Sequence, residues 1–577
     1  MDKLCKILIS LTLTLLLITV PSFADNGVSR FDDVPQGHWA EKAVHDLRLL
    51  KITDGIGSNK YGMGLDIKRC EFVTYLARLM NWETVTPEKG SFIDNMDTSK
   101  WYYPYIETAY RNGAIPEGIK EFRPEDPITR EEMAIMLVNA LGYGYLAQQL
   151  SGLGSDFDDV SENTGYITIA KDFGIITGTG DNRFKPYDTA KREEAAVMMM
   201  RMYEKIKKPI NELHAFYAIR SYPQIDFIPE LDSVSFGWSR IEYDSGKGHV
   251  VLNTTSGNRN DFYIPPGFEE PFNLAEENNV STQLMVFADS NTLVDFGGGK
   301  LPVTELVLTN PELRKQAVSL IAEQVNNTVM NDIEISFDGV VIDFEGMKGE
   351  TLKNAFSSFL GELRNELDIA GKKLIVAVHP ERKPGQEYYD GYDYKTIGQI
   401  ADKVILMAHD YYAKRLSDAE METGYAITPL TPADEIYYAL KAITDKENGV
   451  ENPEKIWLQI SFDSVQWSLQ SGKVLNREPY KPGYEQIRQR LLAKAKVHYS
   501  VVNGNPYIEY IGETDQTRNI IWYEDSRSVM AKVNLAKMFG VNGISLWRLG
   551  NIPNYDDLNG EGLYLDIWQN LLKETQR

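Results

Sequence analysis

The stretch 337–346 constrains the fold of this chain most strongly, because it places two carboxylates inside an otherwise apolar run. If the stretch forms a strand, Val341, Asp343 and Glu345 share one face, and the residues between them share the other. A barrel strand packs its outer face beneath helices and points its inner face into the barrel. We therefore expect two acids inside a barrel. Burying an ionised side chain there costs free energy of desolvation, so the acids point to a function.

Two carboxylates in one pocket repel each other as anions, so one of them keeps its proton near neutral pH. A protonated Glu345 beside an ionised Asp343 is the kind of acid that cleavage of a glycosidic bond requires. The alternative is structural, with both acids paired to Lys or Arg or capping a helix.

The full octet over 338–345, D-G-V-V-I-D-F-E, resembles the signature of the family 18 glycoside hydrolases, the chitinase family. The resemblance implies that Glu345 is the general acid and base, that Asp343 orients the substrate's N-acetyl group, and that Asp338 supports them. The fullest form of that signature has Asp or Asn where this chain has Val341. The substitution removes a partner that would hold Asp343.

The length of 577 residues and a hydrophobic content of 43% predict several domains with ample cores. Residues 1–24 carry Lys3 and Lys6, then an apolar run, then a small-residue cleavage site at Ala24. This is the pattern of a secretory signal peptide. An uncleaved anchor is the alternative, but the apolar run is short for a membrane span.

The net charge and the cysteine content limit which partners and which cellular location this protein can have. The net charge of −23 argues against binding nucleic acid or anionic membranes through bulk charge. Beyond Cys5 in the predicted signal peptide, the sequence has only Cys70, so an exported chain would form no intramolecular disulfide. We expect a secreted bacterial protein of the cell wall or cell surface, with no membrane span after signal cleavage.

The first third of the sequence repeats with a period of about sixty residues. Each unit reads as helix, loop, helix, and an arginine precedes each second helix, as in Ile128-Thr-Arg130-Glu. The predicted units span residues 25–90, 91–155 and 156–205.

These units resemble the S-layer homology (SLH) module, and the resemblance covers all three. It implies an all-α bundle that binds a secondary cell-wall polysaccharide and so places the chain in the surface layer. The motif arginines are Arg69, Arg130 and Arg192, with Trp39 and Trp101 as groove residues. An arginine fork can hold a carboxylate bidentately despite the acidic background. The alternative is that each arginine only closes a local salt bridge.

Residues 206–232 are proline-containing and predict a linker. From 233 to 577, β-rich runs alternate with helical patterns, which predicts a (β/α)8 TIM barrel with a small insertion. The predicted strands are 234–238, 283–288, 339–345, 374–378, 404–409, 456–462, 520–523 and 543–547.

In such a barrel the chemistry gathers at the C-terminal strand ends. Trp547 ends the last predicted strand, and the family uses a Trp there as the floor of its cleavage subsite. Trp238 ends the first predicted strand. Either side chain could instead belong to the hydrophobic core. The segment Met407-Ala-His409-Asp410-Tyr411 matches the family's M-x-Y-D, in which Tyr and Asp help bind the N-acetyl group. Here His409 replaces that Tyr, and a satisfied core histidine is the alternative.

The segments 505–510 and 521–528 resemble the spore-cortex and peptidoglycan N-acetylglucosaminidase branch of the family. No metal cluster or cofactor motif is present, so neither is expected. The sequence therefore predicts a wall-anchored hydrolase of polymers containing β-1,4-linked N-acetylglucosamine, peptidoglycan first and chitin-like glycans next. The rivals are a catalytically silent lectin-like barrel that binds wall glycans and a structural surface-layer protein.

Overall fold

The computed structural model describes residues 30–330, 332–383, 390–555 and 562–576. The predicted signal peptide, residues 1–24, lies outside this part of the chain. The chain forms two compact units, the first from residues 1–140 and 185–201 and the second from residues 141–184 and 202–577.

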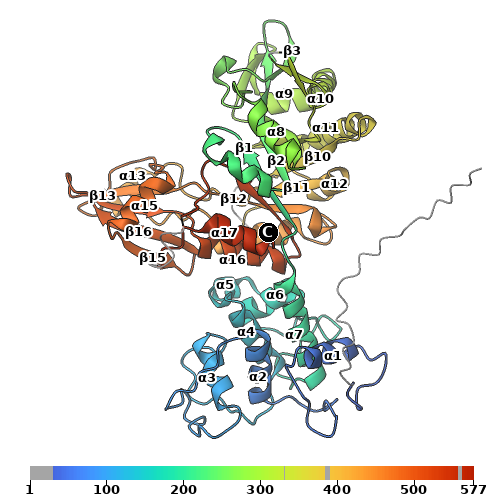
Figure 1. The fold of residues 1–577 in the computed structure, drawn as a ribbon, viewed down its shortest axis with the longest axis vertical. Coiled ribbons are helices and arrows are strands. Elements are labelled where there is room, and N and C mark those ends of the chain that lie inside the picture. Colours follow the sequence, from blue (N-terminus) through green and yellow to red (C-terminus); the bar gives the residue numbers. More distant parts are fainter. Residues whose placement is uncertain (1–29, 331, 384–389, 556–561, 577) are drawn as a thin grey trace, which may run out of the picture. The chain divides into compact units, whose positions relative to one another are not determined.

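The repeat region is helical, as predicted. Its helices are α1 (Glu41–Leu49), α2 (Arg69–Leu79), α3 (Tyr103–Arg111), α4 (Arg130–Ala140), α5 (Gly144–Leu150), α6 (Thr164–Asp172) and α7 (Arg192–Lys207) (Figure 1). The second helix of each repeat, α2, α4 or α7, begins at the motif arginine.

A closed ring of backbone hydrogen bonds joins the three repeats just before these helices. The N–H of Ile67 donates to the carbonyl of Ala190, that of Ala190 to Ile128, and that of Ile128 to Ile67, each at 3.0 Å. Each bond links one repeat to the next, so the three bonded segments are arranged around a pseudo-threefold axis.

The second unit contains an eight-stranded parallel barrel within the described residues, which confirms the predicted fold. Strand β1 pairs with β2 on one side and with β18 on the other, and this closes the sheet. In order around the barrel the strands are β1 (Glu212–Tyr217), β2 (Ser233–Asp244), β4 (Ser281–Asp289), β9 (Gly339–Glu345), β10 (Lys373–Val378), β11 (Lys403–Leu406), β12 (Ile456–Ser461) and β18 (Gly543–Trp547). Strand β3 (His249–Asn253) pairs antiparallel with β2.

Helices cover the outside of the barrel. Phe344, on the outer face of β9, packs against Phe356 and Phe359 of α11 with ring centroids 5.9 and 5.4 Å apart. This contact agrees with the alternation expected for 337–346. Besides α13 and α15, described below, the α-helices after β2 in the described residues are α8 (Glu269–Glu277), α9 (Val303–Thr309), α10 (Pro311–Asn326), α11 (Gly349–Ile369), α12 (Tyr394–Ile400), α14 (Ala433–Ile443), α16 (Ser526–Met538) and α17 (Ile567–Glu574).

Two short hairpins are attached to the barrel between β4 and β9. They consist of β5 (Leu293–Phe296) with β6 (Gly299–Pro302), and of β7 (Thr328–Met330) with β8 (Ile333–Ile335).

The insertion between β12 and β18 is an antiparallel sheet. Its strands, in spatial order, are β14 (Lys473–Val474), β13 (Val465–Gln470), β17 (Arg518–Trp522), β16 (Asn505–Ile511) and β15 (Lys496–Ser500). Helix α15 (Tyr484–Leu492) belongs to the same insertion, and α13 (Asp418–Thr423) precedes it in the chain.

Two strand assignments from the sequence are wrong. The run 520–523 lies in this inserted sheet and not in the barrel, whereas β1 lies in the segment predicted as a linker and completes the barrel. A short apolar run does not distinguish a barrel strand from a strand of an antiparallel sheet, because both are β-rich and buried.

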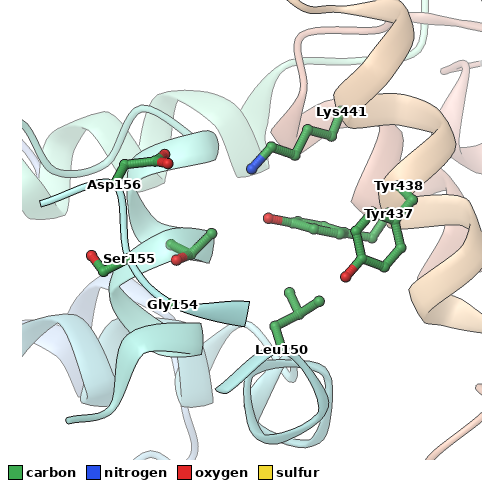
Figure 2. Close-up of a pocket in the computed structure, with 8 residues that line it drawn as sticks. Leu150, Gly154, Ser155, Asp156, Tyr437, Tyr438 and Lys441 are labelled. Carbon is green, nitrogen blue, oxygen red and sulfur yellow. The ribbon is translucent and has the colours of Figure 1, made fainter. Parts of the chain in front are cut away.

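Part of the third repeat packs against the barrel within the second unit. Lys441 of α14 forms an ion pair with Asp172 of α6 at 2.9 Å. Beside this pair lies a pocket of about 120 Å³, lined by Leu150, Gly154, Ser155, Asp156, Thr168, Tyr437, Tyr438 and Lys441 (Figure 2). None of these residues lies at a C-terminal end of a barrel strand.

No helix in the described part of the chain has the length and apolar character needed to cross a membrane.

Candidate active site

Asp343 and Glu345 lie together at the C-terminal end of β9. Asp343 is buried, and within the described residues its Oδ1 has no hydrogen-bond partner. The Glu345 side chain is 36% exposed and therefore open to the barrel mouth. Below them Val341 packs in the apolar interior of the barrel. The structure thus places both predicted acids on one inward face, with an apolar floor where the family signature has a third polar residue.

Burial raises the pKa of Asp343. Burial also raises the pKa of Glu345, and the negative charges of Asp343 and Asp289 raise it further. Asp289 is the register partner of Glu345 on the neighbouring strand β4. A carboxyl group in such surroundings keeps its proton near neutral pH, which is the state that a general acid needs.

His379, which directly follows β10, joins the acids and was missed by the sequence analysis. Its Nε2 lies 3.9 Å from Oε2 of Glu345. Burial, with a smaller effect from His409, lowers the pKa of His379 to about 3, so the ring is neutral. The inward alternation of Ile375, Ala377 and His379 along β10 is the signal that could have identified it.

His409 and Asp410 follow β11 at the same end of the barrel. The His409 Nε2 is 2.6 Å from Oε1 of Gln459 on β12, and its Nδ1 is 3.5 Å from Oδ1 of Asp410. Burial lowers the pKa of His409, but Asp410 and Gln459 outweigh it and the net pKa is raised. With Gln459 accepting the Nε2 proton, Nδ1 faces a carboxylate, which favours the imidazolium form.

Three partly buried aromatic side chains ring the mouth above the apolar core of the barrel. Trp547, at the end of β18, packs against Phe216 with ring centroids 5.2 Å apart, and Phe262 packs against Phe287 at 4.8 Å. Aromatic faces that remain partly open to solvent can stack on sugar rings. Trp547 was predicted for this role, whereas Phe262 and Phe287 were not.

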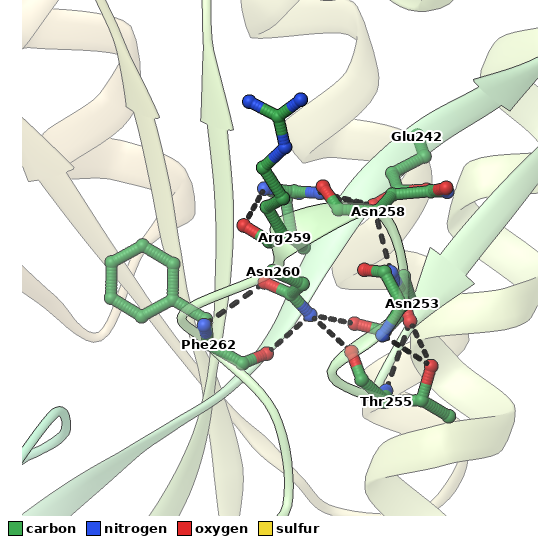
Figure 3. A network of polar contacts seen from close by, with 9 residues as sticks. Glu242, Asn253, Thr255, Asn258, Arg259, Asn260 and Phe262 are labelled. Carbon is green, nitrogen blue, oxygen red and sulfur yellow. Dashed lines mark hydrogen bonds and ion pairs between the residues drawn. The ribbon is translucent and has the colours of Figure 1, made fainter.

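The loop that carries Phe262 is held rigidly. Nδ2 of Asn260 donates to the carbonyls of Asn253 at 3.0 Å and of Phe262 at 2.7 Å, and the N–H of Phe262 donates back to Oδ1 of Asn260 at 2.9 Å. Glu242 accepts from Nδ2 of Asn253 and of Asn258 (Figure 3). Phe262 is therefore fixed before any ligand binds.

Two predicted site residues do not join this cluster. Asp338 is exposed and precedes β9, so it lies at the opposite end of the strand, where its Oδ2 accepts from the N–H of Thr282 at 2.9 Å. Trp238 is 2% exposed and stacks on Phe236 at 4.2 Å. It lies within the strand, because β2 continues to Asp244, so its ring packs in the core and does not face a ligand.

Met407 and Tyr411 lie on either side of the His409–Asp410 pair. Met407 is buried in the apolar barrel interior. The Tyr411 ring lies beneath the Arg382 guanidinium, 4.7 Å from ring centroid to Cζ, and its buried hydroxyl has no hydrogen-bond partner within the described residues. Tyr411 therefore packs beside Arg382, while Met407 belongs to the apolar floor below the acids.

The motif arginines of the repeats are buried and already paired. Each guanidinium forms an ion pair with a glutamate on the second helix of the next repeat, which is a longer-range pairing than the local salt bridge considered above. The pairs are Arg69 with Glu132, Arg130 with Glu194 at 2.7 Å, and Arg192 with Glu71 at 2.6 Å. By contrast, Trp39 and Trp101 are 62% and 56% exposed.

The chain matches two family models. Residues 276–551 match the model of glycosyl hydrolases family 18, and residues 96–134 and 156–196 match that of the S-layer homology domain.

Several curated proteins are similar to parts of the chain. A putative sporulation-specific glycosylase, YdhD, of Bacillus subtilis is 25% identical over 44% of this chain and 55% of its own length. A cortical fragment-lytic enzyme of Bacillus anthracis is 25% identical over 48% of this chain and 59% of its own length. The S-layer protein sap of Bacillus anthracis is 28% identical over 29% of this chain and 20% of its own length. The chain thus spans less than two thirds of each of these relatives.

Proposed function

Because this chain joins S-layer homology repeats to a family 18 glycosyl hydrolase domain, we propose that it is a wall-anchored glycoside hydrolase. Its substrate is a polymer containing β-1,4-linked N-acetylglucosamine, with peptidoglycan favoured and chitin-like oligomers next. The observation that carries the proposal is the pair of acids at the mouth, with the pKa of Glu345 raised by burial and by Asp343.

The chemistry that fits this geometry is substrate-assisted. Glu345 donates its proton to the glycosidic oxygen while the substrate's own N-acetyl carbonyl oxygen attacks the anomeric carbon, and the bond to the leaving sugar breaks. Asp343, buried beside Glu345, holds the N-acetyl N–H. Water then attacks the same carbon as the ionised Glu345 takes a proton from it, and the bond between that carbon and the acetamido oxygen breaks. This restores the acid and retains the configuration.

His409 and Asp410 support this role. Nε2 of His409 faces the amide oxygen of Gln459 and Nδ1 faces the carboxylate of Asp410, so His409 orients Asp410 and does not replace the hydroxyl donor that the family supplies with Tyr. Trp547 provides a ring face on which the sugar at the cleavage point can stack.

The repeats supply the anchor. An S-layer protein is among the similar proteins, and S-layer homology modules fit a chain held on the secondary polysaccharide of the wall. The exposed Trp39 and Trp101 are the side chains available for direct contact, while the buried arginines hold the repeats together. Anchoring keeps the barrel at a high local concentration of substrate.

The test is release of reducing ends from purified peptidoglycan and from N-acetylglucosamine oligomers. The secreted protein is compared with its Glu345→Gln variant and with Glu334→Gln, an exposed acid on β8, as the matched control. We expect activity that disappears only in Glu345→Gln, with the β-anomer formed first in NMR spectra of the product. Binding without cleavage by all three proteins would favour the lectin-like barrel, which the apolar surroundings of Val341 make the second candidate.

The anchor is tested separately by sedimentation with wall fragments. The Trp39→Ala, Trp101→Ala double variant should remain in the supernatant, while Tyr145→Ala, another exposed aromatic residue of the repeats, should still sediment. Equal sedimentation of all variants would argue against these two residues as the contact.

A further inference from the structure

The rim of the barrel where β18 and β1 end is built as one rigid platform. The N–H of Leu549 donates to the carbonyl of Phe216 at 3.0 Å, and the Ser221 hydroxyl donates to the carbonyl of Leu549 at 2.8 Å. Oε1 of Gln224 accepts from the N–H of Gly550 at 2.7 Å. These bonds fix the two loops against each other beside Trp547.

The platform presents two arginines, Arg220 after β1 and Arg548 directly after Trp547. Arg220 has a left-handed backbone with a φ of 62°. Its carbonyl oxygen would lie 2.3 Å from a Cβ built on Gly550, so only glycine allows the two loops to approach this closely. Burial lowers the pKa of Arg548, the carboxylate of Asp463 raises it, and the positive charge of the neighbouring Arg220 lowers it.

Neither guanidinium has a salt bridge within the described residues. The hydrogen bond of Arg548 is a long one of 3.3 Å to the carbonyl of Leu549. The carboxylate of Asp463 acts on Arg548 electrostatically, but its own ion pair is with Lys481 at 2.8 Å.

This lack of partners is not due to a shortage of acids, because the chain has 83 Asp and Glu against 60 Lys and Arg. Elsewhere in the same unit Arg314 and Arg364 pair with carboxylates at 2.8 Å. Two neighbouring cations that have no ion pair of their own repel each other, and an anion placed between them would relieve that repulsion.

We propose that Arg220 and Arg548 form a carboxylate-binding subsite that recognises the acidic substituent on alternate sugars of the wall glycan. This inference rests on the proposed function and specifies its substrate class. A sugar stacked on Trp547 places its neighbour at the β18–β1 rim, where a planar guanidinium can bind a carboxylate bidentately. The subsite makes the acidic glycan of peptidoglycan a better substrate than a neutral N-acetylglucosamine polymer.

The carboxylate has two possible sources in peptidoglycan, the lactyl group of the sugar itself or the stem peptide attached to it. Four substrates distinguish them: neutral N-acetylglucosamine oligomers, peptide-free strands with free lactyl carboxylates, the same strands converted to amides, and peptide-bearing fragments. The enzyme variants are Arg548→Gln and Arg220→Gln. Arg518→Gln, an arginine of β17 that is paired with Glu509 and is not part of the rim, is the matched control.

For the wild-type enzyme we expect kcat/KM on the acidic strands to exceed that on the amidated strands at least tenfold. This ratio should fall about tenfold in each rim variant, mainly through KM, and should be unchanged in the control. Loss confined to peptide-bearing fragments would support the subsite and assign the carboxylate to the peptide. Melting temperatures are measured for every variant, and the exposed Arg220 provides the test if Arg548→Gln does not fold.

Equal cleavage of acidic and amidated strands by every variant would overturn the subsite and leave the hydrolase intact. If no substrate is cleaved and Glu345→Gln behaves like the wild type, the proposed function fails. Equilibrium binding of acidic against amidated strands then decides the subsite by itself, since a rim that binds both equally recognises no carboxylate.

Discussion

Nε2 of His379 lies 3.9 Å from Oε2 of Glu345, where the adjacent strands β10 and β9 end. Burial lowers the pKa of the histidine to about 3 and raises that of the glutamic acid. At neutral pH the pair therefore consists of a neutral imidazole and a protonated carboxyl group. The proton stays on Glu345, where the glycosidic oxygen can take it.

The first prediction concerns pH. The negative charge of Asp289 raises the pKa of Glu345, so the Asp289→Asn variant should lower that pKa. Glu345 acts as the protonated acid, and the alkaline limb of kcat/KM should accordingly move to lower pH. The measurement is a pH profile of reducing-end release for the wild type and the variant. Asp295→Asn, an exposed acid on β5, is the control, and an alkaline limb that moves to higher pH would contradict the assignment.

The second prediction concerns stability. Asp343 has a folded-state pKa raised by burial above its ordinary value of 3.8. Above that ordinary value the unfolded chain ionises while the folded chain holds the proton, so stability is lost as the pH rises. Asp343→Asn removes this cost, so its free energy of unfolding should exceed that of the wild type at pH 8 but not at pH 4, by about 1.4 kcal/mol per unit of pKa shift. Calorimetric unfolding of both proteins at the two pH values measures the difference. Activity should fall in the same variant.

The third prediction distinguishes the structural role of Trp238 from the substrate-binding role of Trp547. Trp238→Ala should destabilise the protein by about 3–5 kcal/mol, because it leaves a cavity in a packed core. Trp547→Ala should lower kcat/KM at least tenfold, equivalent to about 1.4 kcal/mol, with a much smaller change in stability. Calorimetry and kinetics on both variants give the comparison. The reverse pattern would mean that Trp238 contacts the glycan after all.

The fourth prediction concerns the repeats. Glu71→Ala leaves the buried Arg192 without its carboxylate and should destabilise the repeat transition by about 3–5 kcal/mol. Glu125→Ala breaks the exposed pair with Lys68 and should cost at most about 1 kcal/mol. Equal effects of the two changes on the calorimetric transition would remove the structural role that we give to the motif arginines.

Local pattern in the sequence predicted the acid-bearing strand well. The alternation over 337–346 places Asp343 and Glu345 inward and Phe344 outward, because a strand has a period of two whatever its neighbours are. His409 and Trp547 were identified because each ends a β-rich run, and both lie at the mouth.

Other site residues depend on information that a local pattern does not contain. Trp238 ends a recognisable motif, but its strand runs on, and only the three-dimensional packing reveals this. Asp338 was placed by resemblance, although four residues of strand separate it from Asp343. Phe262 reaches the mouth through a loop whose hydrogen bonds cannot be read from spacing. Arg220 and Arg548 are adjacent only because β1 pairs with β18.

The backbone ring through Ile67, Ala190 and Ile128 has a consequence for how this anchor can evolve. An open solenoid can gain or lose a unit at either end, since each repeat contacts only its neighbours. Here the third unit bonds back to the first. Deleting one repeat would leave an unpaired N–H donor and an unpaired carbonyl acceptor at the centre. A fourth repeat would find every donor and acceptor of the ring already used. Three repeats are thus needed to close the ring, as eight strands close the barrel. The anchor can gain or lose repeats only in complete sets of three.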